Sequence, residues 1–111
     1  VVNNVETFLA SARVVQWGGY WLRGEGTDQS AGSKILSVSG DCARPGIYEY
    51  PFGTPVHRVL SDCGAENTQA VQISGAAGAT LSPAEFDRLI AFEDLPTAGS
   101  FIATLAHFAV Q

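Results

Sequence analysis

Apolar residues near the start of the chain recur every three or four positions. They are Val5, Phe8, Leu9, Ala12 and Val15. This period places them on one face and predicts an amphipathic helix. Asn4 can cap its beginning with a side-chain oxygen, and Gly18-Gly19 can end it because glycine readily adopts a positive φ.

A short aromatic turn, a loop and a pair of strands are predicted next. Residues 24–33 combine glycine with Ser, Thr and Asp, which is typical of a flexible loop. Residues 34–40 (KILSVSG) and 46–51 (GIYEYP) are apolar or alternate in polarity, and the turn residues DCARP separate them. This pattern predicts a β-hairpin.

A helix is predicted directly after the hairpin. Thr54 can cap it, Pro55 suits its first turn, and Gly64 marks its end. Its apolar stripe consists of Val56, Val59 and Leu60.

The rest of the chain predicts a third strand and two less regular segments. Residues 70–74 (AVQIS) form the strand, and the glycine-rich residues 75–79 end it. Ser82 and Glu85 make a capping-box arrangement around Pro83, which predicts a short helix. The apolar run after Gly99 is either a strand or a C-terminal helix.

The order of these elements indicates an α+β fold. Hairpin, crossing helix and further strand is the order of a β-grasp (ubiquitin-like) domain, here preceded by an N-terminal helical arm. We expect the arm at residues 1–33, the β-grasp domain at 34–102 and a tail at 103–111. The predicted core consists of Ile35, Leu36, Val38, Ile47, Val56, Val59, Leu60, Val71 and Ile73.

Charge and composition exclude several classes of protein. Eleven acidic residues against six basic ones give a net charge of −5, without a basic cluster, so a nucleic-acid partner is not expected. No apolar run approaches the roughly 20 residues of a membrane span, and we expect a cytoplasmic protein without membrane insertion. Only 15% of the residues are charged, which suggests that a partner covers part of the surface.

Few residues suggest catalysis or metal binding. Cys42 and Cys63 lack the spacing of a zinc or iron–sulfur site; two free thiols are favoured, and a disulfide is geometrically possible. The Gly24-Glu25-Gly26 sequence lacks the third glycine of a dinucleotide fingerprint, and residues 75–78 lack the lysine of a P-loop.

The remaining titratable residues form no recognisable active-site pattern. They are His57, His107, Glu85, Asp87, Glu93 and Asp94. Solvated or structural roles explain them, so we expect no catalytic residue and no metal ligand in this chain. The adjacent amides Asn3 and Asn4 could meet a polar ligand such as a flavin or a phosphate, although simple helix capping also explains them.

Three segments together resemble a known family. They are VVNNVET at residues 1–7, GSKILSVSGDCARPGIYEYPFGTPVHRVL at 32–60 and FEDLPTAGSFI at 92–102. The chain resembles the FMN-containing, NADH-oxidising subunit of respiratory complex I and its soluble relatives over residues 1–102. The middle segment looks closer to the flavin subunits of NAD-dependent formate dehydrogenases and NAD-reducing hydrogenases.

This resemblance implies the middle part of a longer NADH dehydrogenase-type subunit. In that family a flavin domain binds FMN and NADH, a soluble-ligand-binding β-grasp domain follows, and a C-terminal domain holds a [4Fe–4S] cluster. Asn3 and Asn4 match the family loop that lies against FMN. The implied partners are the flavin and cluster domains and other electron-transfer subunits, and the fragment itself is expected to hold no cofactor.

Two features leave the interpretation open. After residue 102 the chain stays apolar where the family usually has a returning strand and an acidic segment, so residues 103–111 are either a divergent strand or a tail outside the family fold. The alternative function is a free-standing β-grasp domain that binds a small ligand, with Trp17, Tyr20 and Trp21 stacking on it.

Overall fold

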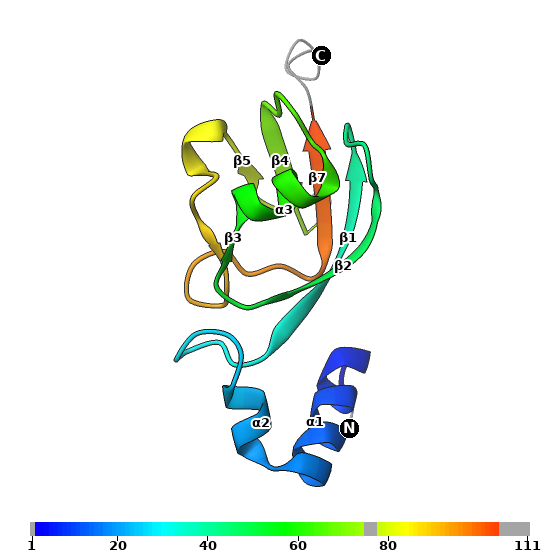
Figure 1. Cartoon of the computed structure of the whole chain (residues 1–111), viewed down its shortest axis with the longest axis vertical. Coiled ribbons are helices and arrows are strands. Elements are labelled where there is room, and N and C mark those ends of the chain that lie inside the picture. Colours follow the sequence, from blue (N-terminus) through cyan, green and yellow to red (C-terminus); the bar gives the residue numbers. More distant parts are fainter. Residues whose placement is uncertain (1, 75–77, 105–111) are drawn as a thin grey trace.

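A five-stranded mixed sheet forms the body of the molecule, and a two-helix arm projects from one end of it (Figure 1). This computed structural model describes residues 2–74 and 78–104. The five strands are β1 (Ser33–Gly40), β2 (Gly46–Pro51), β4 (Ala70–Ile73), β5 (Thr80–Leu81) and β7 (Ser100–Thr104). The chain is therefore α+β, as the sequence predicts.

The sheet has the order β2-β1-β7-β4-β5. β1 and β7 pair in parallel, from Ser37 opposite Ser100 to Gly40 opposite Ala103, and the other neighbours are antiparallel. The first and last strands of the sheet thus lie side by side at its centre.

One helix, α3 (Val56–Cys63), crosses a face of this sheet (Figure 1). Strand residues alternate between the two faces, so every second side chain meets α3. The buried side chains form one cluster made of Leu36, Val38, Tyr50, Val56, Val59, Leu60, Cys63, Val71, Ile73, Leu81, Ile90, Leu95, Phe101 and Ala103. The predicted hairpin, crossing helix and third strand are confirmed.

Two residues of the predicted core lie elsewhere. Ile35 is 38% exposed and Ile47 is 72% exposed. Both belong to the sheet face opposite α3, because Ile35 is one position from the buried Leu36 on β1 and Ile47 is three positions from the buried Tyr50 on β2. The prediction was wrong for these two, since hydrophobicity alone does not say which face of a strand is covered.

The start of α3 differs from the predicted cap. Thr54–Pro55 form the short strand β3, which pairs with β6 (Leu89–Ile90), and Pro55 is the cap residue without a side-chain hydrogen bond. The Thr54 hydroxyl donates to the Pro51 carbonyl at 2.7 Å. The carbonyls of Phe86 and Arg88, just before β6, accept the first two α3 amides instead, so the helix start is satisfied by tertiary contacts.

The capping box after β5 does not open a regular helix. Residues Pro83–Glu85 form a single 3₁₀ turn, and Ser82 makes no side-chain cap. The following residues are drawn into β6, where Ile90 is 1% exposed. Burial of Ile90 and pairing with β3 therefore override the local helical signal.

The final apolar run begins as a strand. β7 extends to Thr104, two residues past the expected domain boundary at 102. The rest of the expected tail, including His107, and the glycine-rich residues 75–77 lie outside the described residues.

The sheet face opposite α3 is open and nearly uncharged. By strand alternation it carries Ile35, Ser37, Ser39, Ile47, Glu49, Ala70, Gln72, Thr80, Ser100, Ile102 and Thr104. Glu49 is the one charged residue in this set. β2 borders the face as an edge strand, with Pro45 before it and Pro51 at its end.

The two faces predict opposite responses to truncation. Leu36→Ala should lower the free energy of unfolding by about 2–5 kcal/mol, because it leaves a cavity in the core. Ile47→Ala, on the open face, should lower it by less than about 1 kcal/mol. Urea unfolding followed by circular dichroism measures both, and equal losses would contradict this assignment of the core.

Candidate functional site

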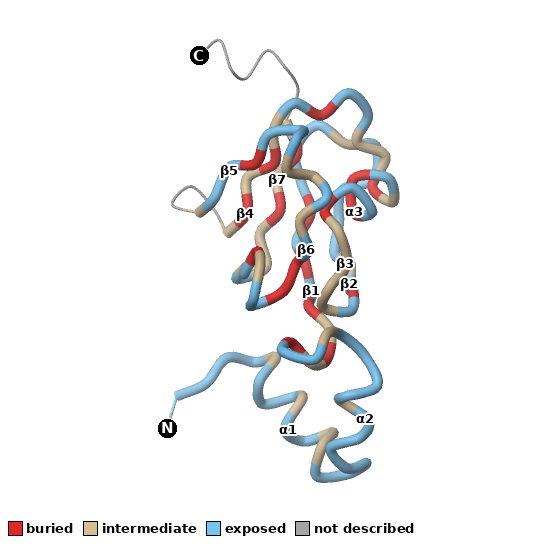
Figure 2. The backbone as a smooth tube through the Cα atoms, turned by 90° about the vertical axis from the view of Figure 1, so that its left-hand side faces the viewer, coloured by how far each residue is buried: buried red, intermediate tan, exposed pale blue. Residues whose placement is uncertain are grey.

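The arm consists of two short helices with no buried residue. They are α1 (Val5–Trp17) and α2 (Gly19–Arg23), and the tube in Figure 2 is exposed or intermediate along both. The exposed fractions of Val5, Val15 and Tyr20 are 81%, 88% and 88%. Within the described part of the chain, the apolar side chains that predict α1 are therefore not part of the buried core.

The ends of α1 follow the sequence prediction. The Asn4 side-chain oxygen accepts a hydrogen bond from the Thr7 amide at 2.8 Å, which caps the first turn. Gly18 ends α1 with a φ of 86°. The predicted aromatic turn differs, because residues 19–23 continue as α2.

Glu6 fastens the arm to the sheet. Its carboxylate accepts hydrogen bonds from Lys34 Nζ at 2.5 Å and from the Ile35 amide at 3.0 Å. The Ser37 amide, two residues along β1, donates to the Gly99 carbonyl just before β7. Glu6 therefore supplies the hydrogen-bond acceptor for the Ile35 amide, which lies beyond the part of β1 that pairs with β7.

These contacts also set the ionisation of Glu6. Partial burial raises its pKa, but the hydrogen bonds from Lys34 and from the Ile35 amide, with the charge of Lys34, outweigh burial. The pKa of Glu6 therefore lies below its ordinary value, and the carboxylate is ionised at neutral pH.

Glu93 holds the loop between the arm and β1. Its carboxylate accepts hydrogen bonds from the hydroxyls of Thr27 and Ser30, which lower its pKa. Ser30 is 1% exposed and its hydroxyl oxygen also accepts from the Phe92 amide. Hydrogen bonds of Thr27 and Ser30 thus connect the loop to Glu93 and Phe92.

Gly26 is required by the backbone geometry of this loop. Gly26 has a φ of 92°, and a Cβ there would lie 2.2 Å from the Ser30 carbonyl oxygen. No other residue type fits without moving the backbone.

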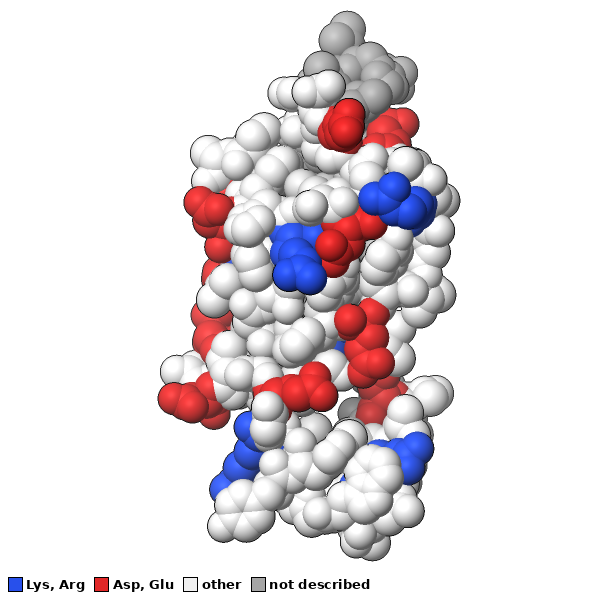
Figure 3. Space-filling model, viewed as in Figure 1, with Lys and Arg blue, Asp and Glu red and all other residues white. Residues whose placement is uncertain are grey.

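A groove of about 410 Å³ lies between the arm and the end of the sheet domain. Its apolar wall includes Leu9, Trp21, Leu22, Phe52 and Phe92, and the Phe52 and Phe92 rings lie 5.1 Å apart between centroids. The polar residues on its rim include Asn4, Glu6, Lys34 and Glu49. Acidic side chains also gather around this junction in Figure 3.

Asn3 and Asn4 both lie exposed at the entrance to α1. Asn4 lines the groove, and its oxygen is occupied by the helix cap. Its side-chain nitrogen can donate two further hydrogen bonds. Capping and ligand contact are therefore compatible roles for Asn4.

The arm aromatics contact one another. The Trp17 and Trp21 rings meet edge to face at 5.4 Å, and the Arg13 guanidinium lies 4.6 Å from the centre of the Trp17 ring. Of the three proposed stacking residues, Trp21 lines the groove.

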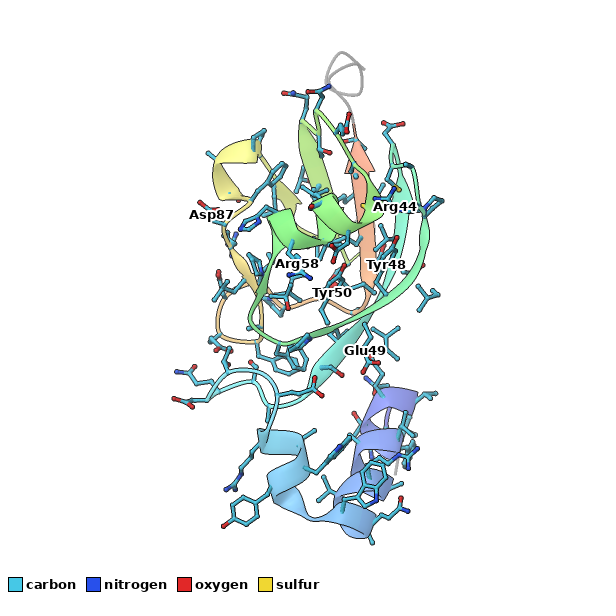
Figure 4. All side chains as sticks on the ribbon, in the orientation of Figure 1. Arg44, Tyr48, Glu49, Tyr50, Arg58 and Asp87 are labelled. Carbon is cyan, nitrogen blue, oxygen red and sulfur yellow. The ribbon has the colours of Figure 1, made fainter. Side chains whose placement is uncertain are left out.

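A second polar cluster joins β2 to α3. The Tyr50 hydroxyl donates to Asp62 Oδ2 at 2.7 Å, and Arg58 Nε donates to the same oxygen at 3.1 Å. Burial first, and then Asp62, raise the pKa of Tyr50 above its usual range. In Figure 4 Tyr48, Tyr50 and Arg58 lie beside one another, whereas Glu49 points toward the arm. We interpret this cluster as a structural contact that holds α3 against β2.

The other candidate carboxylates do not converge. His57 Nε2 lies 3.7 Å from Asp87 Oδ1, whereas Arg88 pairs with Asp94 at 3.0 Å and with Glu85 at 3.5 Å. Within residues 2–74 and 78–104 no group of three or more His, Cys, Asp or Glu side chains is arranged to hold a metal ion.

Sequence reasoning missed the contacts that hold the arm and its loop. Glu6 and Lys34 are 28 residues apart, and Ser30 and Glu93 are 63 apart. No local pattern signals such pairs, and Glu93 looked like one charge on a solvated surface.

Acid should release the arm from the sheet. Because docking lowers the pKa of Glu6, docking is stabilised above the ordinary glutamate pKa and weakens as the pH falls through the lowered value. Both tryptophans of the chain are in the arm, so their fluorescence between pH 7 and 3 reports this step.

Two matched variants isolate the effect of Glu6. Glu6→Gln should weaken docking at pH 7 and abolish the acid-induced change in tryptophan fluorescence. Glu25→Gln removes a charge from the same groove and should retain that change. An acid transition unaltered by Glu6→Gln would refute the anchoring role.

Comparison with known proteins finds relatives that are much longer than this chain. No family model matches the chain. It is 48% identical over 101 residues to NAD-reducing hydrogenase HoxS subunit alpha of Cupriavidus necator, which covers 90% of this chain and 17% of that subunit. It is 32% identical over 115 residues to a subunit of the NADH-quinone oxidoreductase of Escherichia coli, with 99% and 26% covered.

A solved structure has the same fold. The crystal structure of an NAD⁺-reducing [NiFe]-hydrogenase in the air-oxidised state matches with a TM-score of 0.90 and 41% identity, over 96% of this chain and 19% of that one. Among the described helices, none is long and apolar enough to cross a bilayer.

The resemblance seen in the sequence is thus confirmed at the level of the family. The chain spans only about a sixth of the hydrogenase subunit and a quarter of the quinone oxidoreductase subunit. It belongs, as one segment, to the family that unites this NADH-quinone oxidoreductase subunit with the alpha subunit of NAD-reducing hydrogenase HoxS.

Proposed function

We propose that this chain is an interdomain module of a cytoplasmic, NADH-oxidising FMN/iron–sulfur subunit. The parent would transfer electrons from NADH through FMN to iron–sulfur clusters. The names of the relatives support oxidation or reduction of a nicotinamide nucleotide by the whole protein. The module itself would position neighbouring domains.

The exposed apolar arm carries this proposal. Its two helices bury no residue, although α1 presents large apolar side chains along its length. Exposed apolar surface of this kind marks an interaction site. The flavin domain would cover the arm, and the cluster domain and other electron-transfer subunits would meet the remaining surfaces.

We further propose that residues 34–102 form a soluble-ligand-binding β-grasp domain, with residues 1–33 as the arm that leads out of the flavin domain. The single helix across a mixed sheet supports it, as does the central parallel pair of β1 and β7. Strand order alone does not set a function.

FMN is the cofactor that the arm would meet. Two adjacent carboxamides, Asn3 and Asn4, can donate hydrogen bonds to the carbonyl or phosphate oxygens of a flavin nucleotide, and the Asn4 nitrogen is compatible with this role because the cap uses the oxygen. Bound FMN would accept a hydride and release single electrons. The NAD and [4Fe–4S] sites are assigned to other parts of the parent.

A chimera tests the proposal directly. The corresponding segment of the Cupriavidus necator hydrogenase subunit is replaced by this chain, and NADH-dependent reduction of an artificial acceptor is measured together with FMN content. We expect the chimera to assemble and to retain at least about a tenth of the parental rate. A tenfold loss corresponds to an increase of about 1.4 kcal/mol in the activation free energy, which we attribute to imperfect contacts at the new junctions. A well-folded chimera that retains no FMN would reject the interdomain role.

Asn4 variants separate flavin contact from helix capping. Asn4→Ser keeps a capping oxygen but removes the carboxamide donor, so FMN affinity of the chimera should fall about tenfold, as for one lost hydrogen bond. Helicity of the isolated chain, measured by circular dichroism, should be unchanged. Retention of FMN as tight as in the unsubstituted chimera would exclude a contact by Asn4.

The groove favours one alternative, a domain that binds a small ligand on its own. Its volume and aromatic lining fall in the range of small-molecule sites. Titration of the 111-residue chain with FMN decides between the two functions. The interdomain proposal expects no tight binding by the chain alone, and submicromolar binding would favour the alternative.

A further inference from the structure

Cys42 and Cys63 lie together although 20 residues separate them in the sequence. Cys42 follows β1 in the loop to β2, and Cys63 is the last residue of α3. Two consecutive loop amides bind the end of the helix: the Ala43 amide donates to the Gly64 carbonyl at 3.2 Å, and the Arg44 amide donates to the Cys63 carbonyl at 2.8 Å.

A glycine permits this close approach. Gly64 ends α3 with a φ of 70°, and a Cβ there would lie 2.9 Å from the Ala43 Cβ. The loop backbone therefore lies directly against the helix end. Cys42 packs against the core cluster to which Cys63 belongs.

The two thiols differ in access. Cys63 has no exposed surface, whereas Cys42 is half-buried. A shallow hollow of about 710 Å³ lies beside Cys42, lined also by Asp41, Arg44 and Glu66. A small, flexible molecule can reach Cys42 through this hollow, but a protein surface cannot reach Cys63.

We propose that Cys42 and Cys63 form a dithiol modification site for a low-molecular-weight disulfide such as oxidised glutathione. The product is an internal disulfide that joins the β1–β2 loop to the end of α3. This site is independent of the proposed interdomain function.

The chemistry proceeds by two thiol–disulfide exchanges. The Cys42 thiolate attacks one sulfur of oxidised glutathione, whose disulfide bond breaks to release one glutathione. The Cys63 thiolate then attacks the Cys42 sulfur and releases the second glutathione. The two cysteines lose two electrons and two protons, and one glutathione disulfide becomes two thiols.

Burial fixes the order of these steps. Burial, and then the neighbouring Cys42 thiol, raise the pKa of Cys63, so Cys42 is the better entry point. Once Cys42 carries glutathione, the adjacent Cys63 attacks within the same molecule at a high effective concentration.

Peptide mapping tests the proposal on the folded chain. The reduced chain is incubated with oxidised glutathione without denaturant, blocked with an alkylating agent and digested with trypsin. Arg44 precedes proline and resists cleavage, so Arg58 separates the two cysteines. We expect peptide 35–58 linked to peptide 59–88 as the main product, and a rise in Tm of roughly 10 °C.

Single-cysteine variants provide the controls. Cys63→Ala should stop at a stable glutathione adduct on Cys42, and Cys42→Ser should gain at least about tenfold less adduct because Cys63 is buried. If Cys63→Ala does not fold, the peptide map of the wild-type chain still tests the proposal. A persistent adduct on wild-type Cys42, a disulfide between two chains, or unreacted thiols would each overturn the proposal.

Discussion

The parallel pairing of β1 with β7 is the constraint on which the rest of the structure depends. It places residues more than 60 positions apart next to each other at the sheet centre. Antiparallel neighbours then extend the sheet on both sides, and α3 lies over the side chains of one face. The start of β7 also determines where the arm attaches, because Glu6 accepts a hydrogen bond from a β1 amide, that of Ile35, which is not paired with β7.

The sheet domain and the arm are stabilised by different forces. The sheet domain buries a continuous apolar cluster, whereas polar groups hold the arm and its loop, chiefly through Glu6 and Glu93. An arm held in this way keeps its apolar side chains available for a partner. This division suits the proposed interdomain module, because the sheet domain supplies a stable core and the arm offers a surface to which a neighbouring domain can dock.

Local sequence patterns predicted the elements that depend on local chemistry. The period of α1, its Asn4 cap and the glycine that ends α3 followed directly from the residues. Predictions failed where distant segments decide the outcome: β6 pairs with β3 instead of continuing a helix, and Ile47 lies exposed on the sheet face opposite α3. The site contacts were beyond prediction, because Glu93 meets a serine 63 residues away. The family resemblance supplied Asn3 and Asn4, which no local pattern separates from ordinary capping residues.

The prolines around β2 have a consequence for association. An edge strand exposes backbone amides that can recruit a strand from another chain and so promote aggregation. Pro45 and Pro51 lack such amides, and they bracket the edge that β2 presents. Sheet extension from this edge is therefore limited to a few residues. Contacts on the open face are made by side chains, whereas backbone hydrogen bonds are confined to the edge.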